Sequence, residues 1–199
     1  MMKQLSVLLL LVLLMGTFSG CGNRKAVTPD TSLFDTICSA DEALEKAKSS
    51  AVVVMEDLKC TSGKEVWDAF YQTVSRGESA QVLCASYYTL DPALVSPELY
   101  NEEKDKFPML FFSLVAYDGK TYTVKVRQSD RKELDHQDQF PHLLHLTGDA
   151  PRNASFATYD NYVLVDDPTA TMEGIWAGIV SSYAPAGYHH YVVYQDTAG

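Results

Sequence analysis

The apolar and polar positions of this sequence alternate between helical and strand-like periods. Apolar residues at helical spacing predict helices over residues 39–48, 62–76 and 172–180. The first two helices begin with capping-box sequences, at 39–42 and 62–65. Period-two and β-branched apolar runs predict strands over residues 51–55, 81–89, 109–117, 120–127, 140–147, 162–166 and 188–194.

The pattern also predicts how these elements are joined. Asp118-Gly119 stands between two predicted strands and favours a tight hairpin. In the second arm of that hairpin, Tyr122, Val124 and Val126 alternate with polar residues that include Arg127, so one face is expected to be buried and the other solvated. Residues 128–139 are polar and are predicted to form a loop. We therefore expect an α+β fold, with an antiparallel sheet of about five to seven strands and two main helices packed on one face.

The N-terminus has the pattern of a signal peptide, predicted over residues 1–20. Lys3 precedes an apolar stretch at 5–18, which is shorter than the roughly 20 residues needed to cross a bilayer. Ser19-Gly20 then precedes Cys21, and this junction resembles the lipobox of bacterial lipoproteins. The resemblance implies cleavage before Cys21 and attachment of a lipid, with its palmitate-type acyl chains, to the Cys21 thiol. The alternative is an ordinary secreted protein in which Cys21 is unmodified.

The remaining chain divides into a short tether and one domain. Residues 21–31 are polar and are predicted to be the lipidated N-terminus and a flexible tether, and residues 32–199 a single α+β domain. We expect the domain to lie on the extracytoplasmic face of the cell membrane, in an envelope with one membrane or two. A net charge of −10 disfavours nucleic acid as a partner, because the protein would repel the phosphate backbone.

The middle of the chain resembles an uncharacterised family. The features that carry the resemblance are Val52-Val53-Val54, the helix with Trp67 and Phe70 that ends in Arg76-Gly77-Glu78, the strand with Tyr87-Tyr88, and the hairpin Phe111-Phe112…Tyr117-Asp118-Gly119. Over residues 52–127 the chain is similar to a domain-of-unknown-function family of small lipoproteins from Gram-positive bacteria. That resemblance implies location and architecture, and it implies no activity, cofactor or catalytic residue.

The cysteines of the domain leave two interpretations open. Outside the cytoplasm, Cys38, Cys60 and Cys84 allow one internal disulfide and one remaining free thiol. Cys60 precedes a predicted helix N-terminus, where the helix dipole can lower a thiol pKa. With His142 or His145 as a base, Cys60 or Cys84 would give a cell-envelope hydrolase, which is the alternative function.

No cofactor and no metal site are predicted. His189 and His190 are neighbours on a predicted strand and are expected to point to opposite faces, as are His142 and His145. No zinc-ligand motif accompanies them. Asp166-Asp167 precedes a proline and is predicted to form a turn or a helix cap.

The tyrosines suggest a binding surface. The chain has 12 tyrosines, and a groove lined by such rings can bind a protein, a peptide or a glycan. We predict this surface at Tyr87, Tyr88, Tyr188 and Tyr191. The alternative is that these tyrosines lie on a half-buried sheet simply because tyrosine has a high β propensity. The leading hypothesis is a non-enzymatic binding domain. The second is the hydrolase, and the third hypothesis is a purely structural component of the cell envelope.

Overall fold

The computed structural model describes residues 29–152, 154–180 and 187–199. The predicted signal peptide, Cys21 and residues 22–28 of the predicted tether lie outside the described residues. Asp30, which the sequence assigns to the tether, already donates its backbone N–H to the carbonyl of Ala51 at 3.0 Å. Within the described ranges, the structure has no helix with the length and apolar character needed to cross a bilayer.

The described chain is α+β, as expected. Its elements in chain order are the 3-10 helix η1 (Ser32–Asp35), α2 (Ala40–Lys48), β1 (Val53–Glu56), β2 (Lys59–Ser62), α3 (Lys64–Val74), β3 (Ala80–Tyr88), α4 (Pro97–Glu103), the 3-10 helix η2 (Lys104–Lys106), β4 (Met109–Tyr117), β5 (Tyr122–Gln128), β6 (His136–Phe140), β7 (His142–Asp149), β8 (Thr158–Val165), α5 (Met172–Val180) and β9 (His190–Ala198).

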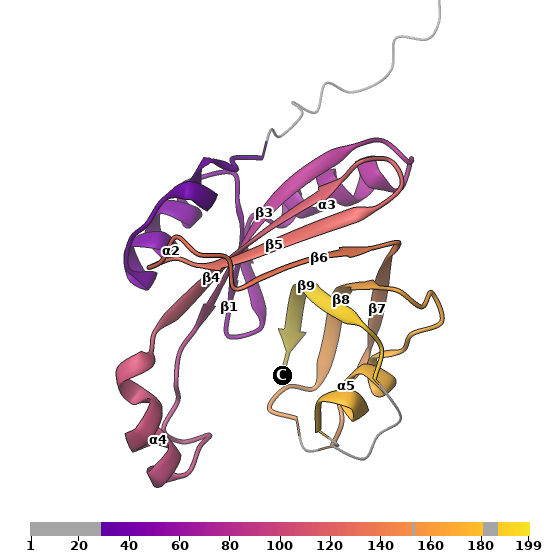
Figure 1. Cartoon of the computed structure of the whole chain (residues 1–199). Coiled ribbons are helices and arrows are strands. Elements are labelled where there is room, and N and C mark those ends of the chain that lie inside the picture. Colours follow the sequence, from indigo (N-terminus) through magenta and orange to yellow (C-terminus); the bar gives the residue numbers. More distant parts are fainter. Residues whose placement is uncertain (1–28, 153, 181–186) are drawn as a thin grey trace, which may run out of the picture.

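The strands form two sheets rather than the one expected antiparallel sheet (Figure 1). The larger sheet has six strands in the order β2-β1-β3-β4-β5-β6, and the smaller has three in the order β7-β8-β9. β1 pairs with β3 in parallel, so the larger sheet is mixed and the prediction of a purely antiparallel sheet is wrong. The parallel pair arises because α3 carries the chain back between β1 and β3, as a crossover connection does.

The two main helices cover opposite faces of the larger sheet, which corrects the expectation that they share one face. Trp67 and Phe70 of α3 pack in the same cluster as Val53 of β1. Leu44 of α2 packs in another cluster with Val54, the next residue of that strand. Successive strand residues point to opposite faces, so α2 and α3 enclose the sheet from both sides.

The smaller sheet shares the core of the larger one. The ring of Trp67 in α3 lies 4.9 Å from the ring of Tyr162 in β8 and 5.0 Å from that of Tyr194 in β9. Val163 of β8 belongs instead to a separate cluster with Ile175 of α5. One face of the smaller sheet therefore packs on α3 and the other on α5.

Two local predictions turn out differently. The Ser39 capping box forms, but α3 has Gly63 as its N-cap and no side-chain cap, so the predicted box at Ser62 is wrong. Gly63 has φ of +74°, and a Cβ there would lie 2.1 Å from the carbonyl oxygen of Val52. Glycine is required at this position, because any other residue would be strained and would clash with the backbone.

The polar segment 128–139 is only partly a loop. Its last residues belong to β6, which pairs with β5 and places Gln139 opposite Thr123. The hairpin at Asp118-Gly119 is confirmed, with Tyr117 opposite Tyr122 and the Asp118 carboxylate accepting the N–H of Lys120 at 2.8 Å. Strand β2 and helix α4 were not predicted.

Candidate functional site

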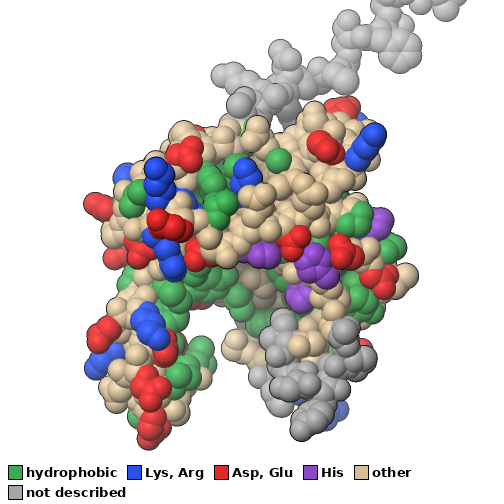
Figure 2. Space-filling model, viewed as in Figure 1, with side chains coloured by type: hydrophobic (Ala, Val, Ile, Leu, Met, Phe, Trp, Pro, Cys, Tyr) green, Lys and Arg blue, Asp and Glu red, His purple; other side chains and the backbone are tan. Residues whose placement is uncertain are grey.

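A projecting segment between β3 and β4, residues 89–108, is called the arm below. It contains α4 and η2, and it extends away from the larger sheet (Figure 1). In the space-filling view the arm stands apart from the lobe formed by the smaller sheet and α5 (Figure 2). Leu94 and Leu99 on the arm are 69% and 45% exposed. Exposed apolar side chains gathered on one projection are typical of a surface that another molecule covers.

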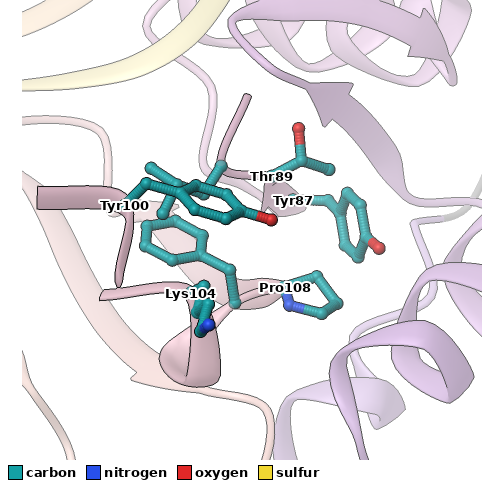
Figure 3. Close-up of a pocket in the computed structure, with 7 residues that line it drawn as sticks. Tyr87, Thr89, Tyr100, Lys104 and Pro108 are labelled. Atoms are coloured by element: carbon teal, nitrogen blue, oxygen red, sulfur yellow. The ribbon is translucent and has the colours of Figure 1, made fainter. Parts of the chain in front are cut away.

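A cavity of about 240 Å³, the small arm cavity, lies on one side of the base of the arm (Figure 3). It is lined by Tyr87, Thr89, Leu90, Tyr100, Lys104, Phe107 and Pro108. The hydroxyl of Tyr100 points toward the side of the cavity where Tyr87 and Thr89 lie (Figure 3). Rings, a hydroxyl and an ammonium therefore surround this cavity.

Tyr87 is held in a fixed orientation by α2. Its hydroxyl donates a hydrogen bond of 2.7 Å to Oδ1 of Asp41. Burial, followed by that hydrogen bond, raises the pKa of Tyr87 to about 12. The ring is therefore neutral and rigid, and it presents a flat surface to the small arm cavity.

A second cavity of about 420 Å³, the large arm cavity, lies on the other side of the arm's base. It is lined by Asp57, Leu58, Tyr88, Thr89, Asp91, Leu94 and Ser155. Tyr87 and Tyr88 enter different cavities because neighbouring strand residues point to opposite faces. Thr89 lines both cavities and so marks the base of the arm.

The arm is joined to the β1–β2 turn at Asp57. The carboxylate of Asp57 accepts the backbone N–H of Thr89 at 2.8 Å and its hydroxyl at 2.7 Å. Asp57 and Leu58 have φ of 46° and 71°, a left-handed conformation that few non-glycine residues adopt. Asp57 and Leu58 form the two-residue turn of the β1–β2 hairpin, in which Leu58 lines the large arm cavity and Asp57 fixes the base of the arm.

The other two predicted tyrosines do not join this site. Tyr191 lies over β4, where its hydroxyl is 2.6 Å from Oγ of Ser113, and burial raises its pKa to about 12. Tyr188 packs on α5, since a Cβ at Gly174 would lie 2.6 Å from its ring. The predicted surface of four tyrosines is therefore divided, and only Tyr87 and Tyr88 line the arm cavities.

The cysteines of the described chain are all free thiols. Burial raises the pKa of Cys84, which is fully buried, and also that of Cys60. The expected lowering of the Cys60 pKa is wrong, because Cys60 lies within β2 and α3 begins only at Lys64. A raised pKa disfavours the thiolate form that a cysteine nucleophile needs.

The histidines contact carboxylates and rings rather than thiols. His145 lies 2.6 Å from Oδ1 of Asp160 and stacks on Tyr162 with ring centroids 4.2 Å apart. His189 contacts Asp138 and Asp166. Across the part of the chain that the structure describes, no hydrogen bond joins a histidine to a cysteine, and no group of three or more His, Cys, Asp or Glu is placed to hold a metal ion.

The turn predicted at Asp166-Asp167 is confirmed for its second residue. Oδ1 of Asp167 accepts the N–H of Thr169 at 2.8 Å and its hydroxyl at 2.7 Å. Asp166 instead accepts a hydrogen bond from His189 at 2.8 Å. Only the first of these contacts is local, which is why the sequence reveals one and not the other.

Sequence reasoning missed the arm. The available signal was Ser96-Pro97, which supplies an N-cap whose hydroxyl accepts the N–H of Leu99, followed by proline at the first helical position. The helix has no buried residue, so it lacks the apolar stripe by which helices are recognised. A search for amphipathic periodicity therefore does not detect an exposed helix of this kind.

Comparison of the chain with protein-family models, with curated proteins and with solved structures gives no match.

Proposed function

We propose that the protein is a non-enzymatic, lipid-anchored binding domain that holds a polypeptide partner at the base of the arm. Cys21 carries the lipid, the polar residues after it form the tether, and the domain faces outward from the cell membrane. The observation that carries the proposal is the placement of two cavities, sharing Thr89, at the base of the arm, with the exposed Leu94 on the wall of the larger of the two.

The residues of the arm suit a polypeptide. Tyr87 and Tyr88 supply rigid rings, which are frequent where partner side chains are held. Leu94 and Leu99 are exposed at an energetic cost that a partner's apolar side chains would remove. The partner backbone would lie along the arm while its side chains enter the cavities.

The charge of the large arm cavity favours a basic residue in the partner. Asp57 and Asp91 lie on its wall together with Leu58 and Leu94. The whole chain carries a net charge of −10, which also steers cationic segments toward it. We therefore expect a partner segment with an apolar residue next to lysine or arginine.

Site-specific photo-crosslinking in intact cells tests the proposal. A photoreactive amino acid replaces Leu94 in one variant of the full chain and exposed Glu173 of α5 in a control variant. We expect a discrete adduct at position 94, none at 173, and a weaker adduct at 94 when Tyr88→Ala is added. Absence of adducts at 94, or equal adducts at both positions, would contradict the proposal and favour a structural envelope component.

A further inference from the structure

A third cavity lies between η1 and the loop that joins β5 to β6, and it is called the η1 hollow below. Its volume is about 510 Å³, larger than that of either arm cavity. It is lined by Phe34, Asp35, Ile37, Arg127, Lys132 and Leu134. None of these residues lines the arm cavities, so the η1 hollow is a separate site.

Arg127 is the most unusual residue of this wall. Its side chain was expected on the solvated face of β5, but the residue is 3% exposed because η1 covers that face. Among the described residues, its guanidinium donates only to backbone carbonyls. These are the carbonyls of Phe34 at 2.8 Å, Thr36 at 2.8 Å, Gln128 at 3.0 Å, Ser129 and Arg131. Carbonyl groups satisfy its N–H donors and leave its full positive charge unneutralised.

In the part of the chain that the structure describes, no carboxylate forms an ion pair with the cations of the η1 hollow. Among the described residues, neither Arg127 nor Lys132 has an acidic group within ion-pair distance, whereas Arg131 pairs with Asp135 at 3.3 Å. Asp35 is the single carboxylate of the wall, against two cations. In a chain with net charge −10, the wall therefore carries a local excess of positive charge. A buried charge without a counter-ion favours an anion that supplies one.

The rest of the wall is apolar. Ile37 and Leu134 are 54% and 45% exposed, and they flank the opening together with the ring of Phe34. In the described residues, four large hydrophobic side chains are exposed, and these two are the ones that lie away from the arm. A cationic end and an apolar side in one cavity match an amphipathic anion.

We propose that the η1 hollow binds the free carboxylate of a medium-chain fatty acid. The carboxylate contacts the ammonium of Lys132 and lies in the field of Arg127, whose own donors are already occupied. The alkyl chain packs against Phe34, Ile37 and Leu134. The volume of about 510 Å³ is within the range of roughly 300–1,000 Å³ found for small-molecule pockets. This site does not depend on the arm or on the proposed partner.

Ligand-observed NMR with octanoate tests the inference. The full-length protein is placed in phosphatidylcholine nanodiscs, and empty nanodiscs measure partition of octanoate into lipid. Octanol and octylamine have the same chain with a neutral or a cationic head, and acetate has the head without the chain. We expect saturable binding of octanoate, with weaker binding of octanol and acetate and none of octylamine.

Variants locate the site. Lys132→Glu is expected to weaken octanoate binding about tenfold, since a charge-assisted contact becomes a repulsion. Leu134→Asn is expected to weaken it as well. Lys120→Glu is the matched control for the change of charge, because Lys120 is exposed and lies outside the η1 hollow. Arg127 is left intact, since its replacement would release η1 from the sheet.

The proposal would be overturned by octanoate binding no stronger than in empty nanodiscs, by equal binding of octanoate and octanol, or by equal weakening by Lys132→Glu and Lys120→Glu. Acetate binding as tightly as octanoate would also overturn it, because the apolar wall would then contribute nothing.

Discussion

His189 joins the two sheets by contacting Asp138. Its Nε2 lies 2.6 Å from Oδ2 of Asp138 in β6, and its Nδ1 lies 2.8 Å from Oδ2 of Asp166, which follows β8. The imidazole also packs on Phe140, with ring centroids 4.7 Å apart, and His136 lies 3.9 Å from the same oxygen of Asp138. A neutral imidazole has one N–H, so both contacts are donated only when His189 is protonated.

The stability that His189 contributes should depend on pH. The hydrogen bonds to Asp166 and then Asp138 raise the pKa of His189 above 6.5. The stabilisation is therefore complete below 6.5 and is lost as pH rises through the raised pKa. The N–H of Gln139, followed by His189, lowers the pKa of Asp138. The stabilisation that Asp138 contributes is therefore lost only as pH falls below 3.8 toward that lowered pKa.

His189→Gln should accordingly lower the Tm more at about pH 5.5 than at about pH 9. His190→Gln is the control, because Nδ1 of His190 contacts a backbone carbonyl, that of Tyr188, instead of a carboxylate. Thermal unfolding followed by circular dichroism measures both variants. An equal loss of Tm at the two pH values would show that the contact between the sheets does not require the charge.

Gly63 and Gly77 should differ in their tolerance of alanine. Both have a left-handed backbone, with φ of +74° and +73°, but a Cβ at Gly77 would have nothing within 4 Å. Gly63→Ala should lower the free energy of unfolding by about 3 kcal/mol, since conformational strain adds to a clash with Val52. Gly77→Ala should cost only about 1 kcal/mol. Urea unfolding midpoints of the two variants check the difference, and similar midpoints would contradict it.

Arg127 should be essential for stability. Arg127→Leu leaves several buried carbonyls without donors and should cost about 3 kcal/mol or more. Arg127→Lys should recover little of this, because a single ammonium cannot reach carbonyls on both η1 and the β5–β6 loop. Urea unfolding measures both, with Lys120→Gln as the exposed control. Full recovery by lysine would show that charge and not geometry is what the site needs.

The thiols should resist alkylation in the folded protein. Burial raises the pKa of Cys84 and Cys60, so both should react more slowly at neutral pH than an unperturbed thiol. Cys84 should become reactive only on denaturation, because it is fully buried. Iodoacetamide labelling followed by peptide mass analysis measures each site. Rapid labelling of Cys60 or Cys84 would instead support the hydrolase alternative.

Cys21 should determine where the protein is found. It lies outside the described residues, and its proposed lipid comes from the lipobox resemblance. Cys21→Ser should move the protein from the membrane fraction to the aqueous one and abolish labelling by radioactive palmitate. Cys38→Ser is the control and should change neither. Retention of Cys21→Ser in the membrane fraction would contradict lipid anchoring.

Several elements specified by residues close in sequence were predicted correctly, although the capping box at Ser62 was not. The Ser39 capping box and the Asp118-Gly119 hairpin form as expected, as does the buried row headed by Tyr122. The capping box and the hairpin depend on contacts over a few residues, which the order of side chains alone specifies. β2 and β6 were missed, because they are the two edges of the larger sheet and their side chains show no apolar alternation.

The predicted tyrosine surface is divided in the structure. Tyr87 and Tyr88 line the arm cavities, whereas Tyr188 and Tyr191 lie elsewhere, and binding at any of them stays a prediction. The division follows from where β9 and α5 pack, which the tyrosines themselves do not encode. The arm was missed because its helix has no buried residue and therefore shows no apolar stripe.

Arg127 shows most clearly which features the sequence alone does not determine. The sequence correctly gives β5 its alternating faces, yet the polar face is covered by η1, so an arginine expected in solvent is buried against Phe34, 93 residues away in the chain. The parallel pairing of β1 with β3 and the contact of His189 with Asp138, 51 residues apart, also join segments that are distant in the chain. Local periods therefore sufficed for most of the helices and strands and for the α+β class. The cavities and the contacts between the sheets required the fold, because they depend on which distant segments cover each face.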